Sequence, residues 1–272
     1  MFKKFLRIIT PNIILKLRRR ILVGLTGSSS QNFLEKRRRQ NLIKKAETVE
    51  DVKKICGELN FTYFLDYDDQ IETKQREFLN AIDFFSLSLQ GKDVLDVGPG
   101  TADSLDVAKA RGASKTFFIE EEDVFVRFAE IKGHSGICKN YTYKPYFPKE
   151  MRNSFDIVYT KGSINCVWVD QQQKLIDEGD PNGFFDFEKW VNELKTLVKK
   201  GGQIILVPAM DKQSKRIIDE EYDLDTFYWC PDLEAYKASF FTRTLVNNGF
   251  TMHENITGFT HKKAFPIAFS FK

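Results

Sequence analysis

One segment constrains the fold more than any other part of the chain: KDVLDVGPGTADSLDVAKARGASKTFFIEEED, residues 92–123. It begins with a short apolar run that contains Asp96 and is followed by two glycines, Gly98 and Gly100. A helical pattern comes next, and a second apolar run ends at Glu120. Strand, glycine turn, helix and strand in this order are typical of a βαβ unit, in which the two strands run parallel and the turn lies at their carboxyl ends.

Strands and helices alternate through the rest of the chain. We expect strands at 93–97, 115–120, 136–139, 155–160, 203–208, 251–258 and 264–271. Helices are expected between them at about 102–111, 121–132, 185–199 and 232–247. Gly201 and Gly202 are expected to end the third of these helices. The alternation predicts an α/β fold with a mostly parallel sheet, and the short segment THKKA between the last two strands predicts an antiparallel terminal hairpin.

Helices are also expected before the first strand. Helical patterns occupy three segments, 2–24, 31–46 and 71–89. Thr48 and Asp51 have the spacing of a capping box, for a helix that runs to about Leu59. We assign residues 1–70 to an N-terminal helical extension and residues 71–272 to the α/β domain.

Charge is distributed unevenly along the chain. Residues 1–45 contain 13 Lys and Arg and one acid, Glu35, which gives +12, whereas the whole chain carries +3. The remainder is therefore acidic, with a net charge of −9. A basic amphipathic arm can lie on an anionic membrane surface with its apolar side among the lipid headgroups. Packing of the arm on the body or on a second subunit stays open, and nucleic acid is disfavoured because the acidic body would repel it.

The sequence contains no pattern for a metal site, a disulfide framework or a membrane-spanning helix. Its four cysteines are far apart, and no histidine stands at metal-ligand spacing, which favours reduced thiols in a cytoplasm. No uncharged apolar run reaches the roughly 18 residues of a transmembrane helix. The apolar region and cleavage site of a signal peptide are also missing. We expect a cytoplasmic protein without a metal, attached at most peripherally to the inner face of the membrane.

The glycine turn and the distal acid together suggest a nucleoside cofactor. Gly98 and Gly100 let a ligand approach the backbone, and the following helix offers free N–H groups. Glu120, 24 residues after Asp96, is suited to accept hydrogen bonds from two ribose hydroxyls. A dinucleotide loop would have a third glycine where Asp103 stands, and an acid there would face a pyrophosphate badly. The pattern fits a cofactor that has a carboxylate and an ammonium group but no phosphate.

Four segments resemble, in order and spacing, the motifs of class I S-adenosylmethionine-dependent methyltransferases: VLDVGPGTADS, the strand ending at Glu120, SFDIVYTKGSI and LVKKGGQIILV. The resemblance covers about residues 75–271. It implies a Rossmann-like sheet of seven strands with the last one antiparallel, and S-adenosylmethionine as cofactor. Two positions depart from the family. Ala102 stands where a third glycine-type residue is common, and the usual acid after the third strand is absent, which leaves Asn140 or a tyrosine near the adenine.

The resemblance also implies roles for individual residues. The methionine part of the cofactor would be held by Asp96, Gly98 and Gly100, and Pro99 and Thr101 would also bind the cofactor. Glu120 would hold the ribose. The residues that follow the fourth strand and would lie near the methyl group are Tyr159, Thr160 and Lys161.

Transfer of a methyl group to a hydroxyl requires a group that removes a proton. Asp170, which follows the fourth strand, and Lys161 are the candidate catalytic residues. We interpret the three histidines, His134, His253 and His261, as surface or structural residues.

Two insertions, 163–184 and 210–231, are expected to shape the acceptor pocket. The second contains Tyr228 and Trp229 among acids, which suits a sugar, although these aromatic side chains could instead close the core. Similar methyltransferases of bacterial surface-polysaccharide pathways begin with a basic, apolar helix. The resemblance therefore implies O-methylation of a sugar or glycan precursor at the membrane surface. A methyltransferase of another small metabolite or lipid, and a catalytically inactive membrane-associated module, stay open as alternatives.

Overall fold

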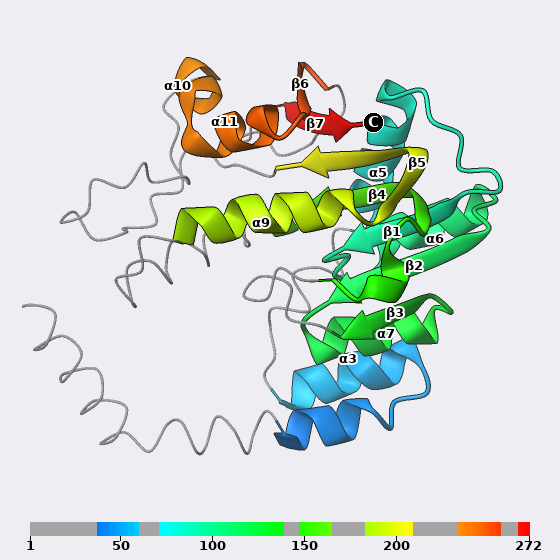
Figure 1. The fold of residues 1–272 in the computed structure, drawn as a ribbon. Helices are drawn as coiled ribbons and strands as arrows, with labels where there is room; N and C mark the ends of the chain where they lie inside the picture. Colours follow the sequence, from blue (N-terminus) through cyan, green and yellow to red (C-terminus); the bar gives the residue numbers. More distant parts are fainter. Residues whose placement is uncertain (1–36, 60–70, 139–146, 165–182, 209–232, 257–265) are drawn as a thin grey trace, which may run out of the picture. The chain divides into compact units, whose positions relative to one another are not determined.

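The computed structural model describes residues 37–59, 71–138, 147–164, 183–208, 233–256 and 266–272, which Figure 1 draws in colour. The chain divides into two units, residues 1–60 and 61–272, which we describe one at a time. The domain boundary expected at residue 70 and the helices expected at 2–24 lie outside the described residues and stay predictions.

The described part of the first unit is helical. Residues 37–43 form a helix within the segment expected at 31–46, and α3 spans Val49–Glu58. The hydroxyl of Thr48 accepts the N–H of Asp51 (3.1 Å), and the carboxylate of Asp51 accepts the N–H of Thr48 (2.9 Å). This reciprocal pair confirms the capping box, and it satisfies amides that the first turn of a helix leaves without partners.

The second unit is built on a seven-stranded sheet with the order β3-β2-β1-β4-β5-β7-β6 (Figure 1). The strands are β1 (Asp93–Val97), β2 (Lys115–Glu120), β3 (Ser135–Cys138), β4 (Phe155–Lys161), β5 (Val198–Val207), β6 (Thr251–Glu254) and β7 (Ile267–Phe271). The first five strands pair in parallel, whereas β7 pairs antiparallel with both β5 and β6. The α/β, Rossmann-like fold with its antiparallel terminal strands is thereby confirmed.

Helices cover both faces of this sheet. They are α5 (Ile71–Phe84), α6 (Asp103–Ala110), α7 (Asp123–Ile131), α9 (Gly183–Lys195), α10 (Leu233–Ala238) and α11 (Phe240–Asn247). Trp190 of α9 and Phe241 of α11 are buried in one core with Leu95 of β1. Phe78 of α5 belongs to a second core with Val94 of β1. Successive residues of β1 thus enter opposite cores, which is why this strand is apolar on both faces.

The structure corrects the element boundaries around β5. The helix expected at 185–199 ends at Lys195, and β5 begins at Val198 rather than at 203. Gly201 and Gly202 therefore lie inside β5 and do not end a helix. Gly201 has a φ of +80°, and a Cβ at Gly202 would lie 2.7 Å from a backbone oxygen, so the strand itself requires both glycines. The pairing of β5 with β4 is irregular at this point.

Other elements are shorter than expected. The helix expected at 232–247 is divided at Ser239, whose hydroxyl accepts the N–H of Thr242 (3.2 Å) and caps α11. α5 ends at Phe84 instead of residue 89, and Ser86 follows with a φ of +52°. β6 ends at Glu254 instead of residue 258.

Candidate functional site

The topology locates a candidate site at the carboxyl ends of β1 and β4. The chain proceeds from β1 outward through β2 to β3, and then returns to form β4 on the other side of β1. Ligands of open α/β sheets bind outside the carboxyl ends of the strands at such a switch point. Two segments meet there, the loop Gly98–Ala102 after β1 and the residues that follow Lys161 of β4.

The loop after β1, which we call the glycine loop (Gly98–Ala102), has a left-handed backbone at three residues. Gly98 and Gly100 have φ values of +73° and +58°, and Ala102 has +61°. The loop is closed by a hydrogen bond from the N–H of Ala102 to the carbonyl of Pro99 (3.1 Å). Because glycine adopts this backbone without strain, the value at Ala102 explains why a glycine-type residue also suits that position.

Glu120 binds the glycine loop directly. One carboxylate oxygen accepts the N–H of Gly100 (3.2 Å), and the other accepts the N–H groups of Glu121 (2.8 Å) and Glu122 (3.1 Å). Burial raises the pKa of Glu120 to about 7, although these hydrogen bonds oppose the shift. Since each carboxylate oxygen can accept two hydrogen bonds, the oxygen that faces Gly100 has room for one more donor.

Asp96 is a second buried acid beneath the glycine loop. Its carboxylate accepts the hydroxyl of Ser104, in the first turn of α6. Burial raises the pKa of Asp96 to about 7, and the bond from Ser104 only partly offsets this. Its oxygen Oδ1 has no hydrogen-bond partner among the described residues. A buried acceptor without a donor is costly, so this oxygen is suited to receive a donor from a ligand or a water molecule.

Tyr159 and Thr160 lie in β4 beside β1. Tyr159 is the register partner of Asp96, and its ring packs edge-on against Phe78 of α5 with centroids 4.9 Å apart. Burial, and next the charge of Asp96, raise the pKa of Tyr159 well above 10. Within the described part of the chain, neither Tyr159 Oη nor Thr160 Oγ1 has a hydrogen-bond partner. Both residues lie within β4 rather than after it, with polar atoms left unsatisfied, and their place near a methyl group stays a prediction.

Lys161, at the carboxyl end of β4, forms a buried ion pair that the sequence did not suggest. Its ammonium group contacts the carboxylate of Glu77 on α5, whose side chain is 2% exposed. Burial, followed by the charge of Lys74, lowers the pKa of Lys161 to about 8, and the contact with Glu77 opposes this shift. Lys161 is thus held against α5 with a quarter of its side chain exposed.

Ser163 connects the two segments of the site and was also missed. Its hydroxyl donates to the carbonyl of Gly98 (2.9 Å), so the loop after β4 is joined to the glycine loop. Gly162, with a φ of +70°, allows the turn, and its N–H donates to Val207 of β5 (3.0 Å).

Several predicted site residues lie outside the described part of the chain. They are Asn140, Asp170, Tyr228, Trp229 and His261, and their roles stay predictions. His134 and His253 are described, and both have side-chain partners: His134 contacts Asp106 and Thr116 (each 2.8 Å), and His253 contacts Ser270 (2.9 Å). These contacts agree with their interpretation as structural residues.

The described residues contain no group of three or more His, Cys, Asp and Glu side chains that could hold a metal ion. In the same part of the chain, no helix combines the length and the apolar character required to cross a membrane.

No protein-family model matches the sequence, and no curated protein matches it. The fold is similar to solved structures. One is an S-adenosylmethionine-dependent methyltransferase from Mesorhizobium loti (14% identity, 70% of this chain and 94% of the other, TM-score 0.46). Another, from Aquifex aeolicus, has 14% identity, coverage of 77% and 95%, and a TM-score of 0.47. A DhpI–SAM–HEP complex has 13% identity, coverage of 85% and 98%, and a TM-score of 0.48. At these values the likeness assigns neither a family nor a reaction, so function has to be argued from the site.

Proposed function

We propose that the chain is an S-adenosylmethionine-dependent methyltransferase of class I. The observation that carries this proposal is the hydrogen bond between Gly100 of the glycine loop and the buried carboxylate of Glu120, at the switch point of the sheet. It places an acceptor for hydroxyl groups next to a loop that a ligand can approach closely. The sequence motifs that resemble this family fall on β1, β2, β4 and β5, and the first three of these strands carry residues of the site.

The charges around the glycine loop fit this cofactor better than a dinucleotide. The charge of Asp103 is offset by Lys74 and Lys132, but two other buried acids, Asp96 and Glu120, lie beside the loop. They favour a ligand with an ammonium group and hydroxyl groups, and they disfavour a pyrophosphate. The unsatisfied Oδ1 of Asp96 is suited to the ammonium group, directly or through water, and the oxygen of Glu120 that faces Gly100 is suited to one ribose hydroxyl.

In this proposal the cofactor supplies a methyl group activated by its sulfonium. The glycine loop, with Pro99 and Thr101, holds the amino-acid end, while Tyr159 and Thr160 line the wall formed by β4. When the acceptor is a hydroxyl, its proton must leave as the new bond forms. Lys161 and Asp170 are the proposed acceptors of that proton. Lys161 can accept it only in its neutral form, which its lowered pKa of about 8 makes accessible near neutral pH.

We expect purified protein to bind S-adenosylmethionine and S-adenosylhomocysteine but not NAD, as measured by calorimetry.

With an accepting glycan fraction, Lys161→Met should lower methyl transfer by roughly 100-fold while cofactor affinity changes little. Lys200→Met, an exposed lysine near the amino end of β5, is the matched control and should transfer normally. In Lys161→Met the buried carboxylate of Glu77 loses its lysine partner. The double variant Glu77→Gln/Lys161→Met removes that carboxylate charge as well.

The outcomes separate the competing functions. Binding of NAD instead of the sulfonium compound would overturn the proposal. Cofactor binding without transfer to any extracted glycan, metabolite or lipid favours the inactive module. Undiminished transfer by Lys161→Met would leave Asp170 as the remaining candidate base.

The acceptor that we propose is a sugar or glycan precursor, methylated in the cytoplasm at the inner face of the membrane. Support comes from the two insertions with aromatic and acidic residues and from the net charge of +12 in residues 1–45. A metabolite or lipid acceptor is the alternative.

The membrane association of the basic arm can be tested by vesicle flotation. The full chain should float with vesicles that contain anionic lipid and should remain in solution with neutral ones, since each basic residue near the surface contributes about 1 kcal/mol. Exchanging Arg18, Arg19 and Arg20 for Glu should abolish flotation. Flotation that is independent of both lipid charge and these arginines would contradict the proposal.

A further inference from the structure

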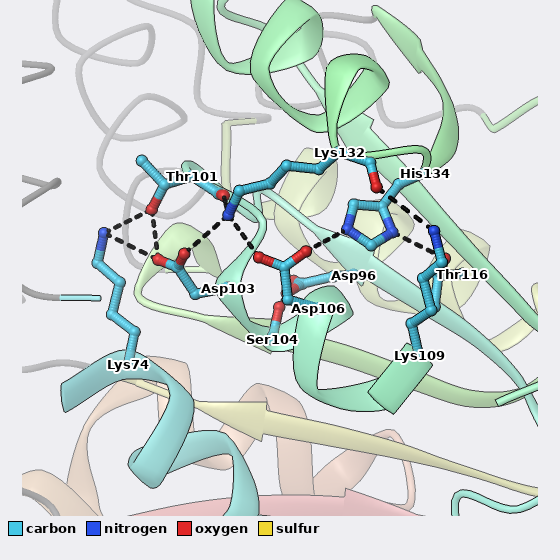
Figure 2. A network of polar contacts seen from close by, with 10 residues as sticks. All are labelled: Lys74, Asp96, Thr101, Asp103, Ser104, Asp106, Lys109, Thr116, Lys132 and His134. Carbon is cyan, nitrogen blue, oxygen red and sulfur yellow. Dashed lines mark hydrogen bonds and ion pairs between the residues drawn. The ribbon is translucent and has the colours of Figure 1, made fainter. Parts of the chain in front are cut away.

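Lys132 reaches from the end of α7 to the glycine loop. It is the residue that follows the last turn of α7, and its side chain is 17% exposed. Its ammonium group donates to the carbonyl of Thr101 (2.8 Å) and to the carboxylates of Asp103 (3.1 Å) and Asp106 (2.5 Å). Figure 2 shows these three bonds converging on one nitrogen. All three N–H donors of the lysine are therefore used.

Lys74 approaches the same loop from α5. Its ammonium group donates to the hydroxyl of Thr101 (3.2 Å) and lies 3.9 Å from the carboxylate of Asp103. The hydroxyl of Thr101 in turn donates to Asp103 (2.5 Å) (Figure 2). Asp103 is 1% exposed. Its charge is neutralised from two sides by Lys74 and Lys132, which stand far from it in the sequence.

The glycine loop needs such support from outside. Ala102 has the left-handed φ of +61°, which an L-residue with a side chain rarely adopts unless its surroundings impose it. The N-cap residue of α6 is Ala102, whose methyl side chain cannot cap the helix. A carboxylate as deeply buried as that of Asp103 is tolerated only with paired charges and hydrogen bonds. Lys132 meets two of these needs at once, because it holds the carbonyl that precedes Ala102 and the carboxylate that follows it.

We infer that Lys132 is a positioning residue for cofactor binding: it fixes the glycine loop in its binding conformation before the ligand arrives, with Lys74 as the second support. This inference rests on the proposed function. Lys132 need not touch the ligand. It raises the fraction of molecules whose loop can bind, and the apparent affinity scales with that fraction.

The same bonds tie the glycine loop to a more distant part of the sheet. Asp106, which accepts from Lys132, also contacts His134 (2.8 Å), and the other ring nitrogen of His134 contacts Thr116 of β2 (2.8 Å). Lys109 of α6 donates to the backbone carbonyl of Lys132 (3.4 Å) but has an exposed side chain. Lys109 is therefore a matched control, because it contacts Lys132 without contacting the loop.

The test is the calorimetric affinity for S-adenosylhomocysteine. Lys132→Met should weaken binding by roughly tenfold or more, because the loop then samples other conformations. Lys132→Arg, which keeps the charge and several donors, should stay within about threefold of the wild type, and Lys109→Met within about twofold. Equal affinity of Lys132→Met and the wild type would overturn the inference and leave the proposed function intact. A wild type that does not bind would overturn both.

Hydrogen exchange of the ligand-free protein distinguishes the positioning role of Lys132 from a purely structural role. In the positioning role, Lys132→Met should speed exchange in the peptide that covers residues 97–105 while β4 and β5 stay protected. Uniformly faster exchange would show a general loss of stability and contradict the inference. If Lys132→Met does not fold, Lys132→Gln is measured in the same two experiments, and the same outcomes decide. The amide of this glutamine keeps an N–H donor for Thr101.

Discussion

Glu120→Ala should weaken the binding of S-adenosylhomocysteine by roughly 100-fold or more, because hydrogen bonds to a charged group contribute about 1.5–3 kcal/mol each. In the proposed function, the variant removes the acceptor for a ribose hydroxyl. It also removes the acceptor of three backbone N–H groups, at Gly100, Glu121 and Glu122, so the glycine loop loses its attachment to β2. Calorimetry with the purified protein measures the loss.

The matched control for this variant is Glu130→Ala. Glu130 is an exposed acid on α7 that pairs with Arg127 (3.1 Å), and its removal should leave the affinity unchanged. If Glu120→Ala and Glu130→Ala bind equally well, Glu120 does not hold the ribose.

The pH dependence of binding follows from the same carboxylate. Burial raises the pKa of Glu120 from 4.5 to about 7, and that of Asp96 from 3.8 to about 7. Ligand donors favour the charged forms, so affinity should fall as the pH drops below 7, and binding should release protons near pH 6.5. Glu120→Gln should remove the part of this dependence that belongs to Glu120. In the ligand-free protein, both raised pKa values stabilise the fold at low pH, and this contribution is lost as the pH rises through 7.

Gly100→Val should abolish measurable binding of S-adenosylhomocysteine. Gly100 has a φ of +58°, which a β-branched residue adopts only with strain, of about 1–3 kcal/mol. The strain can be relieved only by moving the peptide whose N–H donates to Glu120, so the glycine loop should lose its binding conformation. Thermal unfolding and calorimetry on the same preparation measure the two effects.

Gly91→Val separates strain from loss of the site. Gly91 has a φ of +71° and stands outside the site, and a Cβ at this position would meet no atom of the described residues within 4 Å. The variant should lower the unfolding temperature by a similar amount and leave affinity unchanged. Equal affinity of the two valine variants would show that the glycine loop does not bind this ligand.

The sequence predicted the fold well where short apolar runs are bounded by turn signals. β1 and β2 were expected at 93–97 and 115–120 and are found there, because short buried runs between turn signals admit few registers. The segment 196–202 misled the prediction because Gly201 and Gly202 were interpreted as a helix end. In the structure, a glycine is needed at position 202 because β5 and β4 approach each other closely there. This approach depends on tertiary pairing and leaves no local pattern in the sequence.

Prediction of the site from the sequence meets the same limit, because contacts between distant residues leave no local pattern. The proximity of the glycine loop and Glu120 was predictable because β1 and β2 are parallel neighbours whose carboxyl ends meet at one edge of the sheet. Glu77 gave only a weak signal, an acid next to Phe78 on the apolar stripe of α5. Lys132 and Ser163 gave none, since their partners Thr101 and Gly98 lie 31 and 65 residues away in the sequence.

The place of β7 has a consequence for synthesis of the protein. This strand comes last of the seven along the chain, yet it lies between β5 and β6. Until residues 267–271 have left the ribosome, β5 and β6 each present an unpaired edge, and such edges recruit strands from other molecules. Translational pausing or premature termination ahead of residue 267 should therefore yield nascent chains that depend on chaperones and aggregate readily.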